Sequence, residues 1–382
     1  MSHYLGMRPW ATPAMRDVFS DEHVLRHALA FEAALARAQL AEELIDASAA
    51  QAIGTACDTL APDPAELAEQ AAFAGTLAIP LVTSLRQHLG DHPAARLVHL
   101  GATSQDLADT VLMCQVKAAH AVLLPDLERL CAALAGLARE HAACPAIGRT
   151  LLQDATAVGF GLRLAQALAG IDFAWAQLDA AIATHARLQL GGAAGSRAGL
   201  QGRGAAIAQR VAAALELAAG PPWHAQRVGV GAIASALGLL IGAVGKPARD
   251  IALLAQNAIG EAQEPRIAGR GGSSAMAHKR NPTGCQVALS AAIRAPGLVA
   301  SVLGGLPQEQ ERGLGGWQAE APVLAELFGL VSASLAAMAV VAGGLEVNQA
   351  AIAANLEASG LDAEIGESVA IVNALLASLR RS

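Results

Sequence analysis

The chain has 382 residues, which is enough for two or three domains and a large buried core. Apolar residues make up 54% of it and charged residues only 15%, so the composition excludes a disordered protein. Because aromatic residues contribute only 3%, alanine and leucine must form most of the core, which favours closely packed helices over β-sheet. The net charge is -7 and no basic run occurs, which argues against nucleic-acid binding.

The cysteines and the N-terminal residues indicate the compartment. No CxxC pair or zinc-ligand spacing occurs, and an odd number of cysteines is typical of reduced thiols in the cytoplasm. The N-terminal residues MSHYLGMRPWATP contain no apolar core and do not form a signal peptide. We therefore expect a cytoplasmic protein without a metal site. The cysteines are Cys57, Cys114, Cys131, Cys144 and Cys285.

Helical periodicity recurs along the chain and predicts an all-α protein. An early helix is expected within residues 19–45, with Ser20 as its N-cap and two acidic residues in its first turn. No sustained alternation of Val, Ile or Thr occurs, so strands are at most minor. Proline and glycine clusters separate long helical runs, which suggests an elongated bundle. These runs are expected at residues 105–143, 155–190, 229–263, 285–304 and 322–343.

Two segments, residues 228–245 and 327–345, lack any charge over about the length of a membrane-spanning helix. Both are rich in Gly, Ala and Ser, and neither has aromatic ends or a basic flank on one side. We interpret them as helices buried in a bundle or between subunits, with membrane insertion as the alternative. The apolar stripe around the first segment predicts its core face. That stripe consists of Ile233, Leu237, Leu240, Ile241, Val244, Ala248 and Ile251.

Three polar islands interrupt the apolar pattern, and the first is HLGATSQDLADT at residues 99–110. Thr103 and Ser104 are expected at a helix start, where an N-cap with Asp106 in the first turn explains them structurally. His99 has no such explanation. Because a helix N-terminus with Thr and Ser hydroxyls also binds anions, this island is a candidate substrate site.

The second island is GRTLLQDATAVGFG at residues 148–161. It places Arg149, Thr150, Gln153 and Asp154 just ahead of a long helix. A solvated loop with a helix cap is an equally good interpretation of this segment when it is taken alone.

The third island is GRGGSSAMAHKRNPTG at residues 269–284. Its glycines allow the backbone to move and to approach a ligand closely. Lys279 supplies positive charge and Asn281 an amide, while Ser273 and Ser274 have no capping role, because the next helix should begin after the Asn-Pro pair. The spacing GxxxxGK[ST] of a phosphate-binding loop is absent.

In this order, the three islands resemble the fumarase/aspartase superfamily, whose members carry a loop of the form GSSxMPxKxNP. GSSAMAHKRNP at residues 272–282 matches that loop, and HLGATSQDLADT and GRTLLQ resemble the other two site segments. The resemblance extends from FEAALARAQ near residue 31 to GLGGWQAE near residue 320. GATSQD, GGAAG, PPWHAQR and GLGGWQAE look most like the 3-carboxy-cis,cis-muconate cycloisomerase subfamily.

The resemblance implies an all-α homotetramer with a central bundle of long helices and active sites shared between three subunits. It divides the chain into an N-terminal helical domain (1–104), a central bundle (105–345) with a mobile loop (269–284), and a shortened C-terminal helical region (346–382). The implied chemistry is reversible β-elimination next to a carboxylate, used in this subfamily to add a carboxylate across a double bond during aromatic degradation. A small tricarboxylate substrate is implied, with no cofactor, no nucleic acid and no membrane.

By position, Ser273 matches the catalytic base of the superfamily. We hypothesise that loop closure excludes water and surrounds Ser273 with backbone N–H groups, which would stabilise its alkoxide. Lys279 and Asn281 match residues that hold a substrate carboxylate, and Arg280 and Arg312 are further candidate cations. The other residues matched to substrate binding are His99, Thr103, Ser104, Arg149, Thr150, Gln153, Ser274 and Met276.

The departures from the superfamily pattern also carry information. Many relatives have a His–Glu pair that protonates the leaving group, and Leu151 and Gln286 occupy those positions here. A carboxylate leaving group, with a pKa of about 4, needs no proton donor, so the loss favours a cycloisomerase over an adenylosuccinate-type lyase. Ala277 replaces the usual loop proline, which should loosen the loop. Asp154 is unfavourable beside a tricarboxylate unless it pairs with Arg149.

Two other functions remain open at this point. One is a different lyase of the superfamily, for which the missing His–Glu pair is awkward. The other is a non-catalytic helical tetramer, favoured by Asp154, Ala277 and the short C-terminal region. The intact Ser273, Lys279 and Asn281 favour an enzyme.

Overall fold

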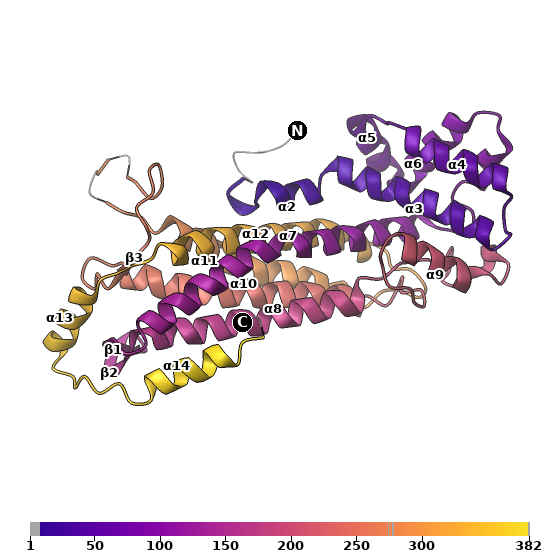
Figure 1. Ribbon diagram of the computed structural model, residues 1–382. Coiled ribbons are helices and arrows are strands. Elements are labelled where there is room, and N and C mark those ends of the chain that lie inside the picture. The colour runs from indigo at the N-terminus through magenta and orange to yellow at the C-terminus, as the bar shows by residue number, and fades with distance from the viewer. Residues whose placement is uncertain (1–7, 274, 277–278, 381–382) are drawn as a thin grey trace.

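The computed structural model describes residues 8–273, 275–276 and 279–380 and shows an elongated bundle of long helices (Figure 1). The all-α prediction is confirmed, since strands are confined to two short two-stranded sheets in the described residues. The α-helices are α2 (Pro13–Val18), α3 (Asp21–Ala41), α4 (Ala47–Thr59), α5 (Pro64–Ala74), α6 (Ala78–Leu89), α7 (Ser104–Glu140), α8 (Phe160–His185), α9 (Gly204–Ala214), α10 (Val228–Leu254), α11 (Thr283–Gly304), α12 (Glu320–Gly343), α13 (Gln349–Ser359) and α14 (Ser368–Ala377). Short 3₁₀ turns lie at Arg8–Trp10, Pro93–Leu97, Ala198–Leu200 and Trp317–Ala319.

The bundle is built from α7, α8, α10, α11 and α12. Helix α10 packs against α8, α11 and α12, and α12 packs against α7. The stripe predicted from spacing lies in the core, because Ile233, Leu240 and Ile251 and the other members are almost completely buried. Burial of this apolar face is the main stabilising contribution to such a helix.

Helices α4, α5 and α6 gather at one end of the bundle, together with α9, while α2 packs against α7 and α12 (Figure 1). The predicted cap of α3 is confirmed, because the Ser20 hydroxyl accepts a hydrogen bond from the His23 N–H at 3.3 Å. A separate small core around Ile53 and Leu85 stabilises α4 and α6 at this end. At the opposite end lie α13 and both sheets, while α14 packs along α8. The three-part division at residues 104 and 345 stays a prediction.

Two expected helix limits are wrong because strands form there. Residues 153–159 are strand β2 (Gln153–Gly159), which pairs antiparallel with β1 (Pro145–Thr150) through Pro145↔Gly159 and Thr150↔Gln153. Helix α10 ends at Leu254, and Gly260 then adopts a positive φ of 63° ahead of β3 (Ala262–Gln263). β3 pairs with β4 (Glu346–Val347), a partner that lies far away in sequence and so is invisible to local periodicity.

By length and composition, three helices within the described residues could cross a membrane: Val228–Leu254, Thr283–Gly304 and Trp317–Gly343. In the first and third, more than half of the most apolar window is buried inside this one chain, but in Thr283–Gly304 only 22% is. Helix Thr283–Gly304 is α11, which therefore leaves an apolar face uncovered, with Ile293 75% exposed.

Candidate active site

The loop between β3 and α11 is closed at a narrow neck. The N–H of Asn281 donates to the carbonyl of Gly271 at 2.7 Å, and the Asn281 amide donates to the Gly272 carbonyl at 3.3 Å. Gly271 has a φ of +70°, and a Cβ there would lie 2.6 Å from the Asn281 carbonyl oxygen, so only glycine fits. The neck brings Asn281 back beside the start of the loop.

Ser273 lies within this loop with its hydroxyl facing the backbone. Its Oγ accepts hydrogen bonds from the N–H groups of Ala275, at 3.2 Å, and Met276, at 3.1 Å. Such donors favour a negatively charged oxygen over a neutral one, because they stabilise charge where it develops. Ser273 therefore has two backbone N–H donors on its hydroxyl oxygen. Ser274 and Ala277, singled out from the sequence, lie outside the described residues.

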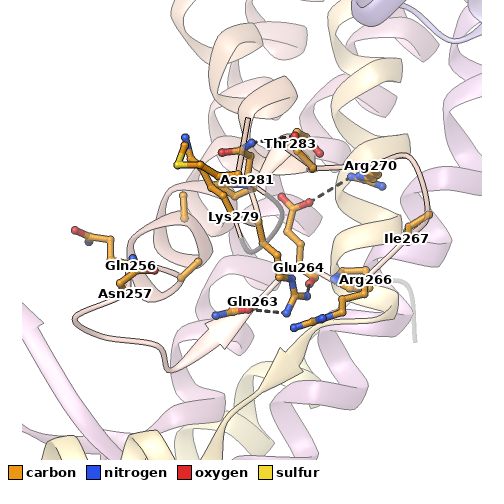
Figure 2. Close-up of a pocket in the computed structure, with 18 of the residues that line it drawn as sticks. Gln256, Asn257, Gln263, Glu264, Arg266, Ile267, Arg270, Lys279, Asn281 and Thr283 are labelled. Carbon is orange, nitrogen blue, oxygen red and sulfur yellow. Dashed lines mark hydrogen bonds and ion pairs between the residues drawn. The ribbon is translucent and has the colours of Figure 1, made fainter. Parts of the chain in front are cut away.

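A cavity of about 870 Å³ lies against the loop and the end of α10 (Figure 2). Its lining includes Met276, Lys279 and Asn281 from the predicted site residues. Four cationic side chains line it against a single carboxylate, that of Glu264, so the cavity suits a polyanion. The cationic residues are Arg266, Arg270, Lys279 and Arg280.

Glu264 fixes the point where the loop joins α11. Its carboxylate accepts hydrogen bonds from the N–H groups of Gly284, at 3.1 Å, and Cys285, at 2.8 Å, in the first turn of the helix. An acidic group at a helix N-terminus satisfies N–H groups that have no partner within the helix. Arg270 pairs with the same carboxylate at 3.6 Å, which ties the first half of the loop to the helix (Figure 2).

Arg149 and Gln153 lie on the β1–β2 hairpin. Arg149 forms a two-pronged ion pair with the fully buried Glu261 at 2.7 and 3.1 Å, and its Nε lies 3.4 Å from Asp154. Asp154 thus pairs with Arg149, which offsets the negative charge that would otherwise disfavour a tricarboxylate nearby. Because two carboxylates already occupy the Arg149 guanidinium, a substrate would have to displace one of them. Thr150 and Gln153 are exposed.

The turn of this hairpin carries a strained pair of leucines. Leu151 and Leu152 have φ values of 51° and 64°, a backbone that two-residue hairpins usually build with Asn and Gly. Strain of this kind costs roughly 1–3 kcal/mol per residue. Leu151 is 96% exposed and Leu152 74%, so neither is held by packing within this chain.

Thr103 and Ser104 begin α7, as predicted, and Asp106 organises the residues around them. Its fully buried carboxylate accepts hydrogen bonds from the N–H groups of Thr103, Gly191 and Gly192, at 2.8–2.9 Å, and contacts Nε2 of His224 at 2.8 Å. Asp106 therefore takes part in the N-cap of α7, as the sequence predicts. It also joins the distant Gly191 and Gly192 to this helix.

Arg312 adds a cation at the same place. It donates to the Thr103 hydroxyl at 2.9 Å and to the carbonyls of Gly192 and Ala193 at 3.1 and 2.9 Å. The Thr103 hydroxyl, the α7 N-terminus and the Arg312 guanidinium together form a positive region in which a carboxylate could bind.

His99 forms a buried pair with Glu32 of α3, with Nδ1 2.5 Å from the carboxylate. Burial disfavours the charged imidazolium, but the Glu32 carboxylate outweighs burial, and the pKa of His99 is raised. Nε2 of His99 is buried and has no hydrogen-bond partner among the described residues. The pair therefore presents an N–H donor for a substrate when the ring is protonated.

We predict that Glu32→Gln lowers the pKa of His99, because burial then acts without an opposing charge. A raised histidine pKa stabilises the fold fully below the unfolded-state pKa of about 6.5, and this stabilisation is lost as pH rises through the folded-state pKa. The variant should thus lose about 2 kcal/mol of unfolding free energy at pH 6 and less at higher pH. NMR titration of the ring and urea unfolding at two pH values measure both effects. Glu69→Gln, on an exposed part of α5, is the control and should change neither; an unchanged His99 titration in Glu32→Gln would contradict the assignment.

The three groups of predicted residues do not meet within one chain. His99, Thr103 and Ser104 lie where α7 begins, and Arg149, Thr150 and Gln153 follow its end. The 37 residues of α7 span about 55 Å at 1.5 Å per residue. The loop with Ser273 lies near the second end but projects from the opposite side of the bundle (Figure 1).

Several residues at the loop were missed from the sequence. Glu261, Glu264 and Arg266 lie just ahead of the loop and Arg270 lies at its start, in a chain that is otherwise poor in charge. That local concentration was an available signal. Glu346 could not be found in this way, because it reaches the loop only through the pairing of β4 with β3.

The fold and these residues define an all-α protein in which a glycine-rich loop carries Ser273 and borders a cationic cavity. The sequence model of the family described as lyase matches residues 6–297, and the chain belongs to this family, part of the fumarase/aspartase superfamily.

Similar proteins indicate a more specific class of enzyme within this family. The chain is similar to the 3-carboxy-cis,cis-muconate cycloisomerase of Pseudomonas putida, with 43% identity over 376 residues, 97% of this chain and 89% of that protein. It is 45% identical to the enzyme of the same name from Pseudomonas aeruginosa, over 90% of this chain and 75% of that one. Its fold is similar to the crystal structure of the 3-carboxy-cis,cis-muconate lactonizing enzyme from Pseudomonas putida, with a TM-score of 0.87, 41% identity and coverage of 94% and 80% of the two chains.

Proposed function

We propose that this protein is a 3-carboxy-cis,cis-muconate cycloisomerase of aromatic degradation. The observation that carries the proposal is the loop itself: Ser273 faces backbone donors, and Lys279 and Asn281 lie at one cationic cavity. The similarity to cycloisomerases over most of the chain supports the same reaction.

In the lactonising direction, one substrate carboxylate oxygen forms a bond to a double-bond carbon, and the neighbouring carbon receives a proton. In reverse, a base removes that proton while the C–O bond breaks and the electron pair leaves with the carboxylate. Ser273 is positioned to exchange the proton, because the N–H groups of Ala275 and Met276 stabilise its alkoxide. Lys279 and Asn281 bind the carboxylate next to that carbon and so stabilise the charge that develops on it.

Leu151 and Gln286 replace the His–Glu pair of many relatives, and this replacement is consistent with a carboxylate leaving group. A lyase with an amine leaving group benefits from an acid there, whereas a carboxylate leaves as a stable anion with a pKa of about 4. The exposed Leu151 offers a hydrocarbon surface instead of a proton donor. A hydrocarbon surface suits the flat carbon skeleton of a diene.

The active site is shared between subunits of a homotetramer. The separation of the three residue groups along and across the bundle supports this, since one chain cannot bring them together. The uncovered apolar face of α11 supports it independently, because a protein in water buries such a surface against a partner. We place the tetramer in the cytoplasm and outside the membrane, working without a cofactor.

We predict that Ile293→Glu disrupts this assembly. A carboxylate at a position that subunit contact removes from water carries an uncompensated desolvation cost, so the wild type should be tetrameric and the variant smaller. Light scattering after size exclusion, without detergent, measures the mass. Phe73→Glu is the control, because Phe73 is also apolar and exposed but lies on α5, away from the bundle. A monomeric wild type, or a tetrameric Ile293→Glu, would contradict the assembly.

The activity is tested with purified protein and 3-carboxy-cis,cis-muconate. Loss of the ultraviolet absorbance of the diene is expected, because lactonisation removes one of its two conjugated double bonds. No loss under conditions in which a known cycloisomerase works would overturn the proposed reaction. Turnover of adenylosuccinate or another amine-releasing substrate in its place would identify a different lyase.

A further inference from the structure

We propose that Arg266 is a substrate-binding residue that acts with Lys279 to select a tricarboxylate over a dicarboxylate. The identity of the tricarboxylate rests on the proposed function. The selection itself rests on which cations in the loop cavity are already paired.

Two of the four cations that line the cavity are committed to carboxylates. Arg270 pairs with Glu264, which the first turn of α11 holds in place. Arg280 forms a two-pronged pair with Glu346 at 3.0 and 3.1 Å and donates to the Gln263 side chain at 2.7 Å. These two guanidinium groups therefore hold the ends of the loop to α11 and to the β3–β4 sheet. Their charges are largely neutralised.

Arg266 and Lys279 are the cations that remain. Within residues 8–273, 275–276 and 279–380, neither side chain forms a hydrogen bond or ion pair with another side chain, and both line the cavity (Figure 2). Arg266 lies close to Glu346, whose pKa is lowered first by its hydrogen bonds from Arg280 and to a smaller degree by Arg266. The Glu346 carboxylate is, however, already engaged on both oxygens by Arg280.

The backbone that leads into Arg266 is anchored. Pro265 restricts the φ of the preceding residue, and the Glu264 carboxylate is fixed by the first turn of α11. An arginine on such an anchored segment presents a planar pair of donors that matches a carboxylate. Arg266 thus has both the charge and the geometry of a carboxylate-binding residue.

Lys279 and Asn281 together bind one substrate carboxylate. A second unpaired cation in the cavity, Arg266, allows it to bind one carboxylate more. A dicarboxylate places one carboxylate on Lys279 and Asn281 and the other on residues outside this cavity. A third carboxylate entering the cavity requires a second cation, because burying it unpaired would be costly. Arg266 is the unpaired cation available there among the described residues.

The test compares the tricarboxylate propane-1,2,3-tricarboxylate with the dicarboxylate succinate, measured by calorimetry on the assembled protein. The variants are Arg266→Gln and Arg266→Lys, with Arg37→Gln on the exposed surface of α3 as the matched control. We expect Arg266→Gln to weaken binding of the tricarboxylate about ten- to a hundredfold and binding of succinate less than threefold. Arg266→Lys should recover part of the loss, because it keeps the charge, and Arg37→Gln should bind both as the wild type does.

The same variants should raise KM for 3-carboxy-cis,cis-muconate with little change in kcat, because Arg266 contacts the substrate and not the reacting carbon. Equal weakening of both ligands, or unchanged tricarboxylate binding in Arg266→Gln, would overturn the inference. So would a wild type that does not prefer the tricarboxylate. If binding depends on Arg266 but no diene is converted, the selection stands and the proposed reaction fails.

Discussion

Ser273→Ala should lower kcat for 3-carboxy-cis,cis-muconate by roughly 10²–10⁴-fold, the range that a positioned acid–base group contributes. The hydroxyl is the only part removed, so the loop backbone and its neck at Gly271 and Asn281 stay in place. Lys279 and Asn281 still bind the carboxylate, and KM should therefore change little. The diene absorbance at saturating substrate measures kcat directly.

The control is Ser301→Ala, which removes a hydroxyl from the exposed side of α11, where its one hydrogen bond among the described residues is to the Gly297 carbonyl. That variant should turn over like the wild type. The pH dependence of kcat is a second criterion. The titration that shapes the pH profile of the wild type should be absent from the residual activity of Ser273→Ala. Equal rates for Ser273→Ala and the wild type would remove Ser273 from the mechanism.

Arg227→Met should destabilise the fold by about 3–5 kcal/mol, the largest stability effect that we expect from one substitution in the bundle. Arg227 is buried and binds two carboxylates: Asp109 of α7 through two bonds of 2.8 Å, and Glu320 of α12 at 3.0 Å. Burial lowers the pKa of Arg227, but the two carboxylates outweigh burial and raise it. Methionine fills the space but leaves two buried carboxylates without their cation, and Asp109 keeps only the hydrogen bond from the Gln189 amide at 3.1 Å among the described residues.

Glu320→Gln is the informative comparison. Burial and the nearby Asp109 carboxylate together raise the pKa of Glu320 more than the Arg227 guanidinium lowers it, so the fold disfavours the ionised form of this carboxyl. A neutral amide of the same shape leaves the Asp109–Arg227 pair intact and should cost about 1 kcal/mol. Urea unfolding at several protein concentrations separates unfolding from subunit dissociation. Similar losses in both variants would show that Arg227 does not act as the shared partner.

The local features of the sequence were sufficient to predict the long helices and their buried faces, but not the short strands. Apolar spacing places Ile233, Leu240 and Ile251 in the core, because helix burial has a period of 3.6 residues that is written in the chain. Ser20 caps α3, because capping depends on residues three positions apart. The loop at residues 272–282 is identified as a catalytic segment because its residue types and spacing are matched within eleven consecutive positions.

The tertiary structure decided which charged groups are paired and which are available. Arg149 looked like a free cation in the sequence, but it is bound by Glu261, which lies 112 residues away. Arg280 is bound by Glu346 and Asp109 by Arg227, over similarly long separations. Asp154 and Arg149, as neighbours across a hairpin, were the exception that the sequence could suggest.

The sequence by itself determined the helical class and the lyase family, and it predicts the roles of Ser273, Lys279 and Asn281, because all of these follow from contiguous patterns. It did not determine the hairpin at residues 145–159, the pairing of β3 with β4, or the commitment of Arg270 and Arg280 to carboxylates. Electrostatic pairing depends on distance in space, which the chain sets only when distant segments pack together. For this reason Arg266 stands out as an available cation only once the partners of its neighbours are known.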